Sequence, residues 1–168
     1  MLWKQFLGIA ILCLALTQLR CVNSQATDTI CNEGFTLVGD KCLMMKFFAI
    51  NWFAADSQCQ SLGAGLLTLQ NEEQLLQINK WVNMDVQIWT SGNKLSNNGV
   101  YYWQNTEAEY LPWAENEPDP SSGNCLILTD MSGGSETIDF RLRVEACLII
   151  NAYICEQLTQ SVETNQVA

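Results

Sequence analysis

Six cysteines constrain the fold of this chain more than any other feature: Cys31, Cys42, Cys59, Cys125, Cys147 and Cys155. Two further cysteines, Cys13 and Cys21, fall in an N-terminal stretch with the form of a secretory signal. Removal of that stretch leaves an even set, which in an oxidising compartment is most simply three disulfides. Six cysteines allow about 15 connectivities, so the pattern alone does not choose among them. Cleavage before Cys21 would instead leave one thiol and favour a covalent dimer.

The N-terminal stretch begins with Lys4 and continues as an apolar run over residues 6–16, with a possible cleavage point after Ser24. The run is shorter than the ~20 residues of a membrane span. We therefore expect residues 1–24 to be a signal peptide and the product to be secreted and extracellular; an uncut signal anchor is the alternative. Residues 25–30 form a short lead, residues 31–157 one domain, and residues 158–168 a polar C-terminal tail.

The charge balance excludes several classes of function. Without Lys4 and Arg20, six basic residues face 18 acidic ones. Such a surface repels nucleic acid and anionic lipid, so we expect no nucleic-acid partner and no membrane insertion. It would suit a cation or a basic partner, although solubility alone also explains it. The chain has no histidine, which excludes Ser-His-Asp and Cys-His catalysis and histidine-based zinc sites. We expect no enzymatic activity.

Hydrophobic spacing predicts two helices in the first half of the chain. The first begins at Asn51, a good N-cap residue. Its apolar positions are spaced by three and four, which places them on one face: Trp52, Ala55, Cys59 and Leu62. The second begins near Asn71, and its buried stripe is Leu75, Ile78, Trp81 and Val82. Cys59 should therefore point at the core.

Apolar runs bounded by turn residues predict strands. They lie at residues 35–38 and 41–44, which form a hairpin around Gly39-Asp40, and at 86–89, 100–103, 125–129, 140–144 and 147–155. Between them, residues 105–124 are irregular and acidic and contain three prolines. A long loop in a small domain is usually functional or disordered, and its aromatic residues favour an ordered one. The pattern predicts an α+β domain.

Several motifs together carry a family resemblance. They are the hairpin cysteines, the two helices, Trp-Thr-Ser-Gly-Asn at 89–93, Trp113, Glu-Pro-Asp at 117–119, and Ile-Cys-Glu at 154–156. Over roughly residues 31–157 the chain resembles the C-type lectin domain, and in particular secreted single-domain insect members. The resemblance implies a C-type lectin-like fold, with two helices, small antiparallel sheets and a long loop region. It also implies three disulfides: Cys31–Cys42, Cys59–Cys155 and Cys125–Cys147.

In the family, a calcium ion in the long loops is shared with two sugar hydroxyls. Glu117 and Asp119 match the ligand positions on either side of Pro118, which is expected to be cis. Glu-Pro-Asp mixes the mannose-type Glu-Pro-Asn with the galactose-type Gln-Pro-Asp, so the motif does not indicate the sugar class.

The remaining ligand positions depart from the family pattern. Gly123 replaces an acid, while Arg143 and Val144 replace an Asn-Asp pair. Two side-chain ligands are too few for tight calcium binding, which needs six to eight oxygens, so a Ca²⁺ site should be weak or absent. An alignment shifted by one residue would bring Glu145 near the site. We hypothesise that the Arg143 guanidinium substitutes for the cation and pairs with Glu117 or Asp119; the alternative is that it points to solvent.

Two aromatic residues, Trp103 and Trp113, are either core residues of the loop region or exposed platforms on which sugar rings stack. The first functional hypothesis is binding of a glycan or glycoprotein, in immunity or reproduction. The second is a calcium-independent domain of the same fold that binds a protein or peptide.

Overall fold

The computed structural model describes residues 30–96 and 99–158. The predicted signal peptide, nearly all of the lead and residues 159–168 of the tail lie outside this range. Within the described ranges, no helix is long and apolar enough to cross a membrane. The domain limits at residues 31 and 157 stay a prediction.

Both predicted helices are present, α2 (Trp52–Ser61) and α3 (Glu72–Val82). Each begins after an asparagine that accepts a hydrogen bond from a backbone N–H three residues on: Asn51 from Ala54, and Asn71 from Gln74. The predicted faces are buried except at two positions, and one of these, Trp81, is half-buried. Leu62 caps the end of α2 and is 44% exposed, because the helix ends before its side chain can join the stripe.

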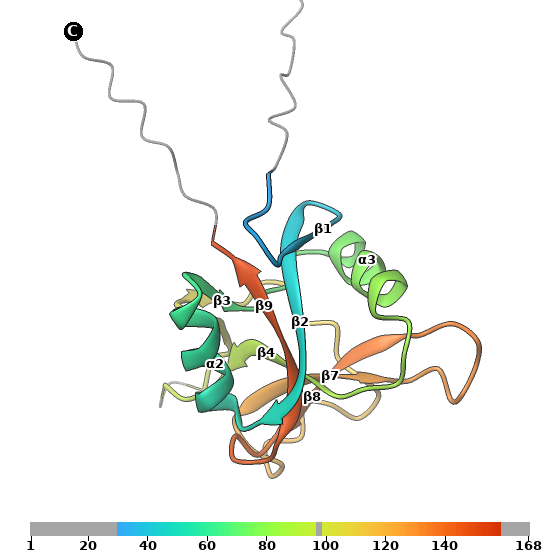
Figure 1. The fold of residues 1–168 in the computed structure, drawn as a ribbon. Helices are drawn as coiled ribbons and strands as arrows, with labels where there is room; N and C mark the ends of the chain where they lie inside the picture. Colours follow the sequence, from blue (N-terminus) through green and yellow to red (C-terminus); the bar gives the residue numbers. More distant parts are fainter. Residues whose placement is uncertain (1–29, 97–98, 159–168) are drawn as a thin grey trace, which may run out of the picture.

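The strands form one connected sheet. They are β1 (Thr36–Val38), β2 (Lys41–Ile50), β3 (Ala64–Leu66), β4 (Ile88–Asn93), β5 (Tyr102–Trp103), β6 (Thr106–Glu107), β7 (Cys125–Asp130), β8 (Phe140–Glu145) and β9 (Asn151–Gln157). The main path is β1-β2-β9-β4-β5-β6; β3 also pairs with β9, and β7 pairs with β4 and β8. The two helices flank the β2–β9 pair (Figure 1).

The predicted fold class is confirmed, with one difference in the sheet. The expectation of small antiparallel sheets misses the pairing of β4 with β9, which is parallel and joins Ile88 to Ala152 and Trp89 to Tyr153. Since β9 also pairs antiparallel with β2, the last strand connects both halves of the sheet. The result is one mixed sheet.

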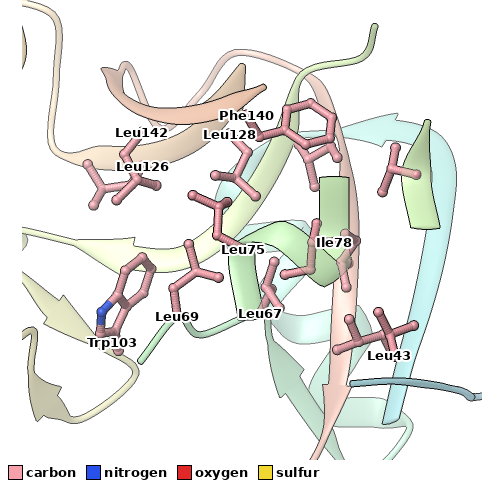
Figure 2. Close-up of a cluster of buried hydrophobic side chains, with 14 of the residues drawn as sticks. Leu43, Leu67, Leu69, Leu75, Ile78, Trp103, Leu126, Leu128, Phe140 and Leu142 are labelled. Atoms are coloured by element: carbon pink, nitrogen blue, oxygen red, sulfur yellow. The ribbon is translucent and has the colours of Figure 1, made fainter. Parts of the chain in front are cut away.

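The core has two parts. A large cluster lies between α3 and the sheet (Figure 2), and it includes Leu43, Leu67, Leu75, Ile78, Leu126, Leu128, Phe140 and Leu142. A smaller cluster lies beneath α2, and it includes Trp52, Cys59, Trp89, Ile127, Tyr153 and Cys155. Strand β8 alternates buried and half-buried residues, which fixes the face on which each of its side chains lies.

All three implied disulfides are present. Cys31–Cys42 ties the N-terminal segment to β2, Cys59–Cys155 ties α2 to β9, and Cys125–Cys147 joins the start of β7 to the turn after β8. The third bond lies at the base of the long loop, so it holds the two strands against which that loop packs.

Candidate ligand-binding site in the long loop

The long loop lies along β8 and is fixed to it by backbone hydrogen bonds. Leu142 N donates to Pro112 O at 2.8 Å, and Ala114 N donates to Leu142 O at 2.9 Å. The alternation of β8 buries Leu142 and Val144 and leaves the Arg143 side chain 41% exposed. These contacts bring the loop and Arg143 together.

Glu117 is the centre of the site. Its peptide bond to Pro118 is cis, and its side chain is only 8% exposed. Oε2 accepts hydrogen bonds from Val144 N at 3.1 Å and Asp119 N at 2.8 Å. Oε1 lies 3.4 Å from Arg143 Nε. The buried carboxylate is thus satisfied by two backbone amides and one guanidinium.

Asp119 is engaged within its own turn. Its Oδ1 accepts from Ser121 N at 2.9 Å and Ser121 Oγ at 2.7 Å, and its Oδ2 accepts from Ser122 Oγ at 3.0 Å. The hydrogen bonds from Ser121, then that from Ser122, hold the pKa of Asp119 below its usual value. In the described ranges Arg143 pairs with Glu117 and makes no ion pair with Asp119.

Gly123 has no room for a side chain. Its φ is 147°, and an added Cβ would lie 2.3 Å from the backbone oxygen of Glu145. The Glu145 carboxylate does not take over the missing role, because its Oε1 accepts from Ala146 N at 2.9 Å. The acid that the family pattern places here therefore cannot be accommodated on this backbone.

These residues do not fit a calcium ion. Calcium prefers six to eight oxygens, but the two carboxylates here are already bonded to nearby donors, and a positive guanidinium lies against one of them. Among residues 30–96 and 99–158 no group of three or more possible metal ligands is found. The role of Arg143 as a substitute for the cation stays a prediction.

The two candidate aromatic platforms differ. Trp103 is only 6% exposed, packs in the larger core cluster and donates from Nε1 to Tyr110 O at 3.1 Å. The pairing of β5 with β4 turns most of its ring inward, and its role in stacking on a sugar stays a prediction. Trp113 is half-buried and lies edge-on to Tyr101, with ring centroids 5.1 Å apart. Its role in stacking stays a prediction.

Sequence reasoning missed two features. One is the backbone N–H of Val144, which binds Glu117 even though the Val144 side chain offers no ligand. The other is a pair of polar cavities beside α2 and the β5–β6 turn. The cavities had one signal, the polar residues Asp56 and Gln60, which follow Trp52 at helical spacing beside the buried stripe of α2.

The family follows from sequence comparison as well as from this geometry. A family model described as "Lectin C-type domain" matches residues 49–157. The chain belongs to the C-type lectin domain family. Members of this family are non-enzymatic binding proteins, and this C-type lectin is accordingly a binding protein rather than an enzyme.

Curated relatives support the same family assignment. C-type lectin 37Db of Drosophila melanogaster is 32% identical over 123 residues, which is 71% of this C-type lectin and 79% of the relative. C-type mannose receptor 2 of Homo sapiens is 30% identical over 70% of this chain, but the match covers only 8% of the receptor. A type-2 ice-structuring protein of Hemitripterus americanus is 26% identical over 62% of this chain and 63% of the relative.

Solved structures show the same fold. A calcium-independent type II antifreeze protein superposes with a TM-score of 0.64 at 24% identity, covering 76% of this chain and 93% of that one. The cow C-type carbohydrate-recognition domain of CD23, in the presence of a GlcNAc2Man3 oligosaccharide, superposes with a TM-score of 0.66 at 20% identity, covering 78% and 98%. At these identities the likeness concerns the fold alone.

Proposed function

We propose that this C-type lectin is a secreted, extracellular protein that binds carbohydrate at the long-loop surface without calcium. The observation that carries the proposal is the Arg143–Glu117 ion pair at 3.4 Å, formed by two residues that align with calcium-ligand positions of the family pattern. Secretion is supported by three disulfides, which are typical of oxidising compartments.

The pair can present donors to a sugar in place of a metal. A guanidinium has five N–H donors, and Glu117 engages only the Nε–H of Arg143. The Arg143 side chain is 41% exposed, so its remaining N–H groups are accessible to hydroxyl oxygens. Because Glu117 is buried and held by backbone amides, its single 3.4 Å contact restricts the guanidinium in part before a ligand binds, which lowers the ordering cost of binding.

Calcium should not stabilise this protein. A ligand raises stability by RT ln(1 + [L]/Kd), so a poor site gains little at millimolar calcium. We expect the melting temperature to be the same in calcium and in EDTA, measured by differential scanning fluorimetry. A rise of several degrees in calcium that EDTA reverses would contradict the calcium-independent site.

Sugar binding is tested on a glycan array with three proteins, each in calcium and in EDTA. The wild type should bind the same glycans in both buffers, and Arg143→Gln should lose about tenfold or more in affinity, as expected when a charged hydrogen-bond donor is removed. Arg141→Gln is the matched control. Arg141 lies two residues away on the same face of β8 and is also ion-paired, with Asp139 at 3.0 Å. Equal losses in both variants, or binding only in calcium, would count against the proposal.

A second candidate is a protein or peptide partner. Exposed apolar residues lie near the end of β2 and in the turn before β9: Phe47 (61%), Phe48 (78%), Leu148 (73%) and Ile150 (64%). The pairing of Ile50 with Asn151 brings these segments side by side (Figure 1). Clustered apolar residues on a surface often mark protein contacts. An array that stays blank in both buffers, with the fold intact by circular dichroism, would favour this candidate.

A further inference from the structure

Two neighbouring cavities open on the surface, and neither Arg143 nor Glu117 lines them. The first, of about 530 Å³, lies between α2, β3 and β4; the second, of about 480 Å³, lies between residues 68–70, the β5–β6 hairpin and the end of β9. Gln104 and Leu158 line both. We propose that the two cavities form one groove that binds a neutral, hydroxyl-rich ligand of disaccharide size. This site is separate from the proposed long-loop site and does not depend on it.

Gln104 and Leu158 lie between the two cavities, and the Gln104 side chain is free to move. Gln104 lies in the turn between β5 and β6 with a φ of 52°. Its Nε2 donates to Leu66 O at 3.4 Å, a long and weak bond. Gly65 allows this position, because a Cβ there would lie 2.3 Å from Gln104 Nε2. Rotation of the Gln104 side chain therefore widens the connection between the two cavities without moving the backbone.

The first cavity is lined by groups that both donate and accept hydrogen bonds. Gln60 donates from Nε2 to Asp56 Oδ2 at 2.6 Å, which leaves its Oε1 as an acceptor. Asn93 uses one amide hydrogen on Ser91 O at 3.0 Å and has a second. Trp52 supplies an aromatic wall. Alternating donors and acceptors beside an aromatic ring suit hydroxyl groups on a small carbon skeleton.

The second cavity adds carboxylates and further aromatic surface. Glu107 and Glu109 are exposed at its edge, and Trp103 and Tyr110 form part of its wall. Glu156 also lines it, but this carboxylate is already paired with Lys41 Nζ at 2.5 Å. The unpaired carboxylates accept hydrogen bonds from ligand hydroxyls.

The charge of the groove disfavours anionic ligands. Among the described residues that line the two cavities there is no lysine or arginine. An anionic ligand would therefore meet carboxylates with no compensating cation. A neutral, hydroxyl-rich ligand suits both cavities. Its hydroxyl groups can donate hydrogen bonds to the carboxylates of the second cavity. They can both donate to and accept from the side-chain amides of the first.

The test uses the full mature chain labelled with ¹⁵N and titrated with maltose, lactose and chitobiose. Glycerol and D-glucose distinguish a free polyol or a single sugar from a longer saccharide, and spermidine tests for a cationic ligand. We expect at least one disaccharide to shift the amides of β3, of residues 103–107 and of α2, and to bind more tightly than glucose or glycerol. Amides of residues 117–123 and 143–145 should not shift.

Two pairs of matched variants locate the contacts. Gln60→Ala and Glu109→Gln should each weaken disaccharide binding about fivefold, the loss of one typical hydrogen bond. Gln58→Ala and Glu115→Gln are the controls, because both residues are exposed but line neither cavity. All four changes are at the surface, so the fold should survive, as circular dichroism would confirm.

Four outcomes would contradict the proposed groove site. The first two are the absence of amide shifts with any disaccharide and a response to spermidine alone. The others are weak shifts that glycerol produces equally and no variant changes, and shifts that occur only in the long loop. The last would leave the long-loop proposal standing. Conversely, retained groove shifts in Arg143→Gln, with loss of array binding, would show that the two sites are distinct.

Discussion

Thr90 and Ser91 are neighbouring buried residues on β4, and they differ in whether the side-chain hydroxyl is hydrogen-bonded. Thr90 Oγ1 donates to Leu126 O at 2.9 Å and accepts from Gly92 N at 3.2 Å. Ser91 Oγ has no hydrogen-bond partner within the part of the chain that the structure describes. A buried polar group costs free energy unless it is bonded. The two hydroxyls should therefore have opposite effects on stability.

Thr90→Val should lower the free energy of unfolding by about 1–3 kcal/mol, because it leaves Leu126 O and Gly92 N without their partner. Ser91→Ala should leave stability unchanged or raise it by up to about 1 kcal/mol, because it removes an unsatisfied group. Urea denaturation of both variants measures the difference. A loss for Ser91→Ala as large as that for Thr90→Val would mean that the Ser91 hydroxyl has a partner.

At the scale of an element, one carboxylate binds both ends of the loop that connects β7 to β8. Asp130 Oδ1 accepts from Ser132 N and from Asp139 N, each at 2.9 Å, and Oδ2 accepts from Ser132 Oγ at 2.6 Å. The Ser132 hydroxyl, with these backbone amides, holds the pKa of Asp130 below its usual 3.8. A carboxyl group whose pKa is depressed by folding stabilises the fold above its unfolded pKa, and this contribution is lost as pH falls through its folded pKa.

We expect the amides of residues 131–139 to lose hydrogen-exchange protection as pH falls below the usual pKa of aspartate. Asp130→Asn should remove most of this dependence, because an amide does not titrate. Asp139→Asn removes the neighbouring acid, whose carboxylate pairs with Arg141, but keeps the backbone N–H that contacts Asp130; the pH dependence should therefore persist in this variant. Unchanged pH dependence in Asp130→Asn would assign the effect to another acid. Exchange is compared between pH values after correction for its intrinsic rate.

The elements that sequence predicts well are those set by local spacing. The helix faces and the caps at Asn51 and Asn71 follow from residues within one or two turns. Features that need strand register are predicted less well. Trp103 faces inward because of β5–β4 pairing, and Gly123 is crowded because the start of β7 lies opposite Glu145. The Arg143–Glu117 contact could be proposed from the sequence because Cys147 has a fixed place in the family pattern. Counting back from it along β8 identified Arg143 as the residue at a ligand position.

At the scale of the whole molecule, the last strand completes the fold. β9 lies between β2 and β4 and also pairs with β3. It further supplies Glu156, which accepts from Lys41 Nζ, Thr68 N and Thr68 Oγ1. Segments from both ends of the domain therefore have to meet before the sheet is complete. The Cys59–Cys155 bond joins α2 to this strand across 96 residues of sequence.

Removal of that bond should cost more stability than removal of a short-range one. In the chain-entropy account, the Cys59–Cys155 loop contributes ~4–5 kcal/mol, while Cys31–Cys42, with a separation of 11, contributes about 3 kcal/mol. We compare Cys59→Ala/Cys155→Ala with Cys31→Ala/Cys42→Ala by urea denaturation under oxidising conditions. The first pair should have the lower midpoint, and it also loses two fully buried sulfurs, which adds to the effect. Equal midpoints, or the reverse order, would show that closing the chain through β9 is not what limits the stability of this domain.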